Sequence, residues 1–272
     1  MTESGQQRLA ELFAGVKAEG RAALLPYLTA GIPTPEQSVE LFVAMAEAGA
    51  DGFEVGIPYA DPLMDGPVIM RAGEQALRNG VTVDVALRVA QQVVERTAKP
   101  VLVMTYVNPV LRIGIDRFFE KVASAGVSGV IIADLPVDEA LPYLVAAKQA
   151  QVGIALFVAP TTDRTRLVSV VESNPSFVYA VAEIGVTGER SANSANTRAL
   201  ASRIRALSDV PIVFGVGIST PEHAAHAAAD GDGVIVGTAI VRRVLEAQSH
   251  EEAKAALTLA VSELAVAVRR SR

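Results

Sequence analysis

The stretch "LLPYLTAGIPTPEQSVELFVAMAEAGADGFEVGI", residues 24–57, contains the unit from which most of the chain is built. Each of its ends is a short apolar run, and a segment with helical spacing lies between them. Thr34 can cap that helix, Pro35 suits its first turn, and Gly49 can end it. This order predicts a strand, a helix and a second strand.

The same unit recurs along the chain. Its apolar runs are almost continuously hydrophobic, which is typical of parallel strands covered on both faces. We expect eight strands, at residues 24–30, 52–57, 100–106, 129–134, 152–159, 177–182, 211–217 and 233–237.

Eight strands alternating with helices predict an α/β protein with one closed (β/α)8 TIM barrel, in a single domain over residues 1–272. An extra helix is expected in residues 1–19, and a helix with a tail in residues 249–272. The alternative is an open doubly wound sheet. Such a sheet normally begins with a glycine-rich dinucleotide turn, and "YLTAGIPTPE" (27–36) is not one, so the barrel is favoured.

Composition excludes several classes of function. The chain has 272 residues, no cysteine and a net charge of −6, which argues against disulfides, zinc–thiolate sites and a nucleic-acid partner. We expect no membrane association, because no run reaches the length of a membrane span and no signal peptide opens the chain. A cytoplasmic protein is the expectation.

Glu54 is a carboxylate inside a predicted strand, at the end where barrel enzymes place their active sites. It shares its face with Gly52 and Gly56, which would leave room above it. Apolar surroundings raise the pKa of a carboxyl group and suit it to proton transfer near neutral pH. A salt-bridged structural glutamate is the other interpretation, while Asp61 and Asp65 could simply be turn residues.

Glycine-centred turns follow the last three predicted strands, at 185–190, 215–220 and 236–241. Glycines let backbone N–H groups approach an anion, and barrels commonly hold phosphate after strands seven and eight. The turns together predict a phosphorylated substrate, although each alone could be an ordinary loop. No histidine or lysine lies at a strand end, so acid–base chemistry falls to carboxylates, and no metal site is predicted.

Several motifs, in order and at matching spacing, resemble those of the tryptophan synthase alpha chain family. They are "YLTAGIP" (27–33), "FEVGIPYADPLMDGP" (53–67), "MTYVNPV" (104–110), "ADLPVDE" (133–139), "VAPTTD" (158–163), "GVTG" (185–188), "GVGIS" (215–219) and "GTAIV" (237–241). The resemblance implies a carbon–oxygen lyase that cleaves indole-3-glycerol phosphate to indole and D-glyceraldehyde 3-phosphate by a retro-aldol reaction.

The resemblance also implies roles for residues. Glu54 matches the general acid–base, and Asp65 matches the carboxylate that accepts the indole N–H and stabilises the indolenine cation. Positions matching the indole pocket are Tyr27, Met104, Tyr106, Ala133, Val158, Tyr179 and the loop residue Thr187. Positions matching the phosphate cradle are Gly188, Gly217, Gly237 and Thr238.

A partner is implied as well: the tryptophan synthase beta chain, in an alpha2-beta2 heterotetramer. Pyridoxal phosphate would belong to that partner, and this chain would need no cofactor. Asp61, Asn108 and Pro136 match the docking surface. A stand-alone lyase, a weakly active subunit that activates its partner, and another phosphosugar barrel remain as alternatives. Met70, Ala182 and Glu183 depart from the family pattern, and Thr238 replaces a commoner serine.

Overall fold

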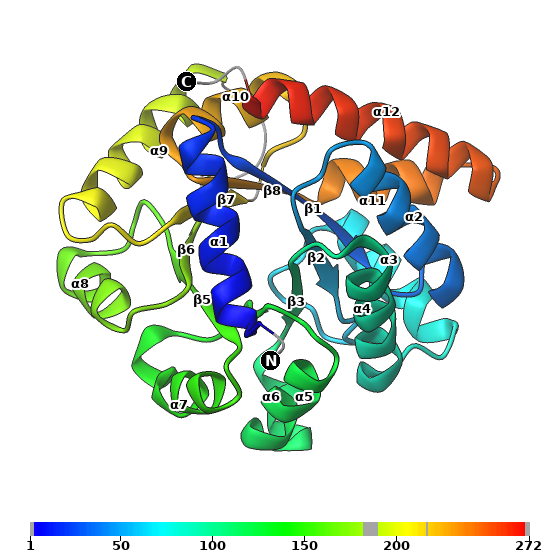
Figure 1. The fold of residues 1–272 in the computed structure, drawn as a ribbon, viewed down its shortest axis with the longest axis horizontal. Coiled ribbons are helices and arrows are strands. Elements are labelled where there is room, and N and C mark those ends of the chain that lie inside the picture. Colours follow the sequence, from blue (N-terminus) through cyan, green and yellow to red (C-terminus); the bar gives the residue numbers. More distant parts are fainter. Residues whose placement is uncertain (1–2, 182–189, 216, 270–272) are drawn as a thin grey trace.

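Eight parallel strands close into a barrel in chain order, β1 to β8, in the computed structural model, which describes residues 3–181, 190–215 and 217–269 (Figure 1). The predicted TIM barrel is therefore confirmed. The strands are β1 (Ala23–Thr29), β2 (Phe53–Gly56), β3 (Val101–Thr105), β4 (Gly129–Ile132), β5 (Gly153–Val158), β6 (Phe177–Val181), β7 (Ile212–Gly215) and β8 (Gly233–Val236).

Helices form an outer ring around these strands (Figure 1). They are α1 (Gly5–Ala18), α2 (Pro35–Glu47), α3 (Pro67–Arg78), α4 (Val83–Thr97), α5 (Val107–Ile113), α6 (Ile115–Ser124), α7 (Leu141–Gln149), α8 (Arg164–Glu172), α9 (Arg190–Arg205), α10 (Pro221–Asp230), α11 (Thr238–Glu246) and α12 (His250–Arg269), with a 3-10 turn at Val137–Glu139. The β2–β3 and β3–β4 connections each hold two helices, where a simple βα repeat has one.

The first β–α–β unit follows its sequence signals. The Thr34 side chain accepts the Gln37 backbone N–H, and Pro35 is the first residue of α2. Gly49 follows α2 with a φ of +107°, a conformation that favours glycine.

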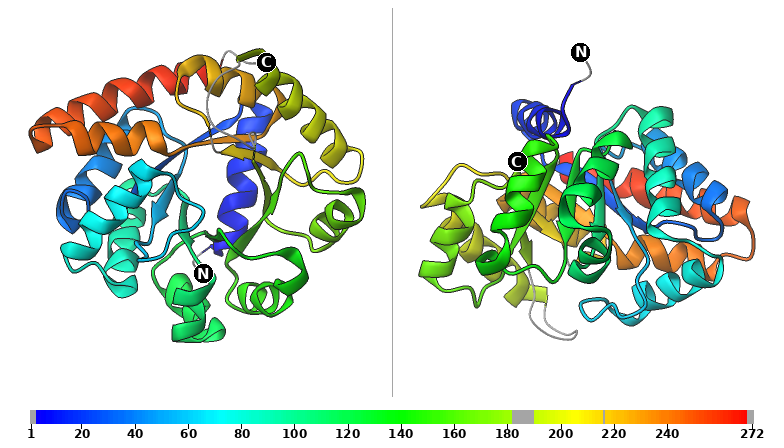
Figure 2. Two further views of the ribbon diagram at one scale, coloured as in Figure 1. Left: turned by 180° about the vertical axis from the view of Figure 1, so that it is seen from behind. Right: turned by 90° about the horizontal axis from the view of Figure 1, so that it is seen from below.

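Helix α1 covers the amino-terminal end of the barrel. It lies across the strands in Figure 1, and the side view of Figure 2 places it at the end opposite α3. Leu9 and Phe13 of α1 are buried, and the Phe13 ring lies 5.8 Å from that of Phe177 in β6. Glycines make room for this helix, because a Cβ at Gly153 would lie 2.6 Å from Leu9 Cδ1.

A buried ion pair joins the starts of β1 and β2 at this same end. Arg21 binds both carboxylate oxygens of Asp51, at 2.7 and 2.9 Å, and both side chains are nearly inaccessible to solvent. Asp51 also accepts the Leu24 backbone N–H at 2.9 Å. The pair therefore fixes one strand against the next.

None of the helices within the described residues combines the length and apolar character that crossing a membrane requires.

Candidate active site

Glu54 lies in β2 with only 3% of its surface exposed, and its Oε2 atom has no hydrogen-bond partner among the described residues. Burial, reinforced by the nearby charge of Asp65, raises the pKa of Glu54 to about 8. At neutral pH the group is therefore mostly a carboxylic acid that can donate a proton.

The space beside Glu54 is not open, contrary to what the flanking glycines suggested. A Cβ at Gly56 would lie 2.1 Å from the Tyr27 hydroxyl, so that hydroxyl occupies the room that this glycine leaves. The Tyr27 hydroxyl lies 3.2 Å from Thr29 Oγ1. The small residue thus allows a tyrosine of the neighbouring strand to reach across β2.

Asp65 lies in the loop between β2 and α3, where its backbone N–H donates to the Pro62 carbonyl at 2.9 Å. Partial burial raises the pKa of Asp65 to about 6, and the Tyr106 hydroxyl opposes that rise. At neutral pH, Asp65 is therefore ionised in most molecules.

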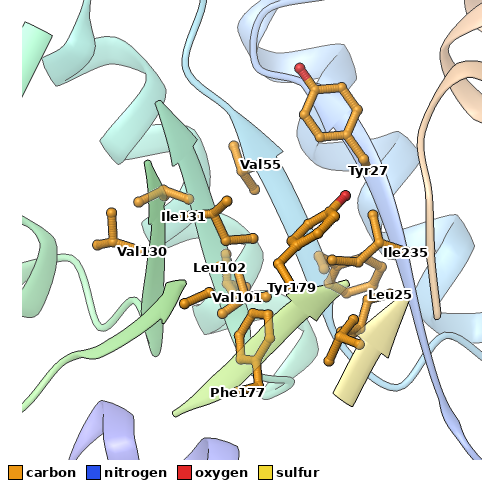
Figure 3. Packing of buried hydrophobic residues seen from close by; sticks show 14 of the residues in the cluster. Leu25, Tyr27, Val55, Val101, Leu102, Val130, Ile131, Phe177, Tyr179 and Ile235 are labelled. Atoms are coloured by element: carbon orange, nitrogen blue, oxygen red, sulfur yellow. The ribbon is translucent and has the colours of Figure 1, made fainter. Parts of the chain in front are cut away.

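Three tyrosines surround the two carboxyl groups. Burial raises the pKa of Tyr27, Tyr106 and Tyr179, and in each case the charge of Asp65 raises the pKa further. Glu54 contributes in the same sense to Tyr27 and Tyr179. Figure 3 shows the hydroxyls of Tyr27 and Tyr179 directed toward the same end of the barrel. Residues of β1, β2 and β6 are thus brought together with Tyr106, which directly follows β3, and with Asp65 of the β2–α3 loop.

The other residues predicted for the indole pocket lie at strand ends around this site. Met104 is in β3, Ala133 directly follows β4, and Val158 ends β5. Phe157 was not predicted, but its ring stacks on that of Tyr179 at 4.6 Å. Thr187 lies outside the described residues.

The predicted phosphate residues follow β7 and β8. Gly217 has a φ of +81°, and Gly237 precedes α11 without any side-chain cap. Thr238 is the exposed first residue of α11. The neighbouring α10, by contrast, is capped by Thr220. The first N–H groups of α11 are therefore not occupied by a capping side chain and suit an anion. Gly188 lies outside the described residues.

The residues predicted to meet a partner lie on the same end of the barrel. Asp61, Asn108 and Pro136 are exposed, and the side chains of Leu63 and Met64 beside them are 82% and 66% exposed. Apolar exposure of this extent, close to a site, is typical of a protein interface.

Comparisons with known proteins identify the family of this chain. The family model for the tryptophan synthase alpha chain matches residues 13–269. The chain belongs to the tryptophan synthase alpha chain family.

Relatives within the family match over nearly their full length. The tryptophan synthase alpha chain of Streptomyces avermitilis is 41% identical, with 97% of this chain and 95% of that protein covered. Among solved structures, Mycobacterium tuberculosis tryptophan synthase has a TM-score of 0.88 at 41% identity, covering 96% of this chain and 98% of that one. The alpha subunit from Legionella pneumophila also reaches 0.88, at 31% identity, covering 98% and 99%.

Membership in the tryptophan synthase alpha chain family makes this chain a lyase-type enzyme. Of the positions that depart from the family pattern, Met70 lies near the start of α3 with its side chain partly exposed, while Ala182 and Glu183 are outside the described residues. No group of three metal-binding side chains occurs within the described ranges.

Proposed function

We propose that this chain is the alpha subunit of a tryptophan synthase and cleaves indole-3-glycerol phosphate to indole and D-glyceraldehyde 3-phosphate. The observation that carries the proposal is the pair of neighbouring carboxyl groups with different protonation states. Glu54, with a pKa near 8, holds a proton at neutral pH, whereas Asp65, with a pKa near 6, is charged. Such a pair can divide acid–base and electrostatic roles between its members.

Glu54 then moves protons, and Asp65 stabilises charge. Protonated Glu54 donates its proton to C3 of the indole ring. Asp65 accepts a hydrogen bond from the indole N–H and stabilises the resulting indolenine cation. The Glu54 carboxylate next takes the proton of the C3′ hydroxyl as the carbon–carbon bond breaks. The electron pair of that bond returns to the ring, the aldehyde forms, and Glu54 is again protonated.

The remaining site residues hold the substrate. Tyr27, Tyr179, Phe157 and Val158 offer an apolar and aromatic environment suited to an indole ring. Gly217, Gly237 and Thr238 would bind the phosphate at the uncapped start of α11. Gripping the phosphate fixes the scissile bond between the two carboxyl groups, which lowers the entropic cost of reaction.

The product indole would pass to a beta chain in an alpha2-beta2 complex. Asp61, Asn108 and Pro136, with the exposed Leu63 and Met64, supply a surface near Asp65 for that partner. This chain would act without a cofactor of its own, in the cytoplasm, with pyridoxal phosphate held by the beta chain. Co-purification with a beta chain would distinguish this assembly from a stand-alone lyase.

Indole release by the purified chain tests the reaction. We expect Glu54→Gln to abolish activity, because the glutamine cannot transfer the proton and no histidine or lysine lies at a strand end to replace it. Asp65→Asn should lower kcat at least about 100-fold, because asparagine can accept the N–H but carries no charge. Glu74→Gln, on the exposed side of α3, is the matched control and should retain full activity. A wild-type chain that releases no indole, or an active Glu54→Gln variant, would contradict the proposal.

A further inference from the structure

Tyr59 connects two loops at the barrel mouth, although the chemistry described above gives it no role. It belongs to the β2–α3 loop, which also carries Asp65. Its hydroxyl accepts a hydrogen bond from Asn108 Nδ2 at 2.9 Å, and Asn108 lies in α5 after β3. The bond therefore joins the Asp65 loop to the neighbouring βα connection.

Asn108 is held in place from the other side. The backbone N–H of Val107, at the start of α5, donates to Asp134 Oδ1 at 2.7 Å. Asp134 follows β4, so α5 begins at a point fixed by a third strand end. The Tyr59 hydroxyl is consequently bonded to a residue in the first turn of an anchored helix.

The Tyr59 ring also packs on Tyr106, with the ring centres 5.3 Å apart and the planes tilted by 34°. Tyr106 is buried, and its hydroxyl makes no hydrogen bond of ordinary geometry within the described residues. That hydroxyl nevertheless lies near enough to Asp65 to lower the pKa of the aspartate. The orientation of the Tyr106 ring, which Tyr59 constrains, therefore bears on the charge of Asp65.

We propose that Tyr59 is a positioning residue for Asp65: its ring holds Tyr106 against the aspartate, and its bond to Asn108 sets where that ring lies. This inference rests on the proposed function. Asn108 is exposed among the residues predicted to contact the beta chain.

Removing the hydroxyl alone tests this arrangement. In Tyr59→Phe we expect kcat for indole release to fall about fivefold with KM unchanged, as for the loss of one hydrogen bond that orients a group. The acid limb of the pH profile should move to higher pH, because a less firmly placed Tyr106 opposes the raised pKa of Asp65 less. Asn108→Ala should have the same effect, and the double variant should be no worse than either single one, because both remove one bond.

The expected shift can also be measured without turnover. Carbon-13 NMR of labelled aspartate side chains gives the pKa of Asp65 directly in wild type and in Tyr59→Phe. Ser173→Ala, which removes a hydroxyl bonded to the Ser169 carbonyl at the end of α8, is the control and should leave that pKa unchanged. Thermal unfolding checks that each variant is folded.

The outcomes separate the two proposals. A wild-type chain that cleaves no substrate contradicts the proposed function, while the NMR titration still tests the role of Tyr59. An unchanged Asp65 pKa in Tyr59→Phe overturns the inference, even if kcat falls, because the tyrosine would then act only on loop stability. Additive losses in the double variant would also overturn it.

Discussion

Glu54 and Asp65 are both carboxyl groups, and the difference between them comes from their depth in the barrel. Glu54 is a strand residue with an unpaired oxygen, and its pKa rises to about 8. Asp65 is a loop residue beside the Tyr106 hydroxyl, and its pKa rises only to about 6. Desolvation disfavours the charged form more strongly at the deeper site.

The two pKa values predict a bell-shaped dependence of kcat/KM on pH. Activity requires ionised Asp65, so it should rise as pH increases through about 6, and it requires protonated Glu54, so it should fall through about 8. Initial rates from about pH 5 to 9.5 at constant ionic strength measure the profile. Because the groups interact, the two limbs report the pair and not each residue alone. A profile that keeps rising above pH 9 would contradict the acid role of Glu54.

Gly56 is predicted to be intolerant of even one added methyl group. In Gly56→Ala the new Cβ would lie 2.1 Å from the Tyr27 hydroxyl and 2.5 Å from its Cζ, so Tyr27 must move and lose its bond to Thr29. We expect the free energy of unfolding in urea to fall by about 1–3 kcal/mol. Gly237→Ala is the control: its Cβ would make an ordinary 3.6 Å contact with the same tyrosine, and stability should change by less than about 1 kcal/mol.

Glu54 could be predicted from the sequence because a lone carboxylate interrupts an apolar strand, and this pattern is visible within a few neighbouring residues. It did not find that Tyr27 fills the space at Gly56, because that contact depends on the register between β1 and β2, where Tyr27 pairs with Glu54. Tyr59 and Asn108 were missed as a pair for the same reason, since only the closed barrel brings their loops together.

Two pairs of neighbouring strands start in the same way at the amino-terminal end of the barrel. Asp51 precedes β2 and accepts the Leu24 N–H of β1, while Asp232 precedes β8 and accepts the Ile212 N–H of β7. Each aspartate also pairs with an arginine, Arg21 or Arg205. The aspartates satisfy backbone donors at the first residues of the ladder, where strand pairing alone leaves them open.

Breaking the more deeply buried of these pairs should destabilise the barrel. Asp51→Ala leaves Arg21 with only the exposed Glu19 as a carboxylate partner and the Leu24 N–H without its side-chain acceptor, so the free energy of unfolding should fall by about 3–5 kcal/mol. Urea unfolding followed by circular dichroism measures the loss. Glu74→Ala removes the exposed ion pair with Arg78 and should cost less than about 1 kcal/mol. Equal losses in the two variants would contradict the assignment of Asp51 as a structural clasp.

At the scale of elements, the sequence predicted every strand, because parallel strands buried on both faces read as continuous apolar runs. It also located the start of α2, through Thr34 and Pro35. It did not separate α3 from α4 or α5 from α6. A seven-residue helix such as α5 is too short to show a clear period.

The two ends of the barrel have different roles, one in stability and one in chemistry. Helix α1 covers the amino-terminal end (Figure 2), where the Arg21–Asp51 pair also lies. The carboxyl-terminal end carries Glu54, Asp65 and the exposed Leu63 and Met64. In barrels of this type, residues at the first end contribute to stability and those at the second to chemistry.

This division predicts that stability and turnover can be changed separately. Phe13→Ala removes a buried ring that contacts Phe177, so the free energy of unfolding should fall by about 3–5 kcal/mol. The kcat of the folded protein should stay within about twofold of wild type, because the helix lies at the end away from the chemistry. Unfolding curves and indole release on the same preparation check both. A large fall in kcat at unchanged stability would contradict the division.

The position of α1 at the amino-terminal end also affects how molecules reach the active site. Because α1 covers the amino-terminal end, the barrel is open at one end only. Substrate must therefore enter, and products must leave, at the carboxyl-terminal end. The beta chain is proposed to bind at this same end. Substrate and indole would then use the same opening, and a partner bound there would control access to the active site.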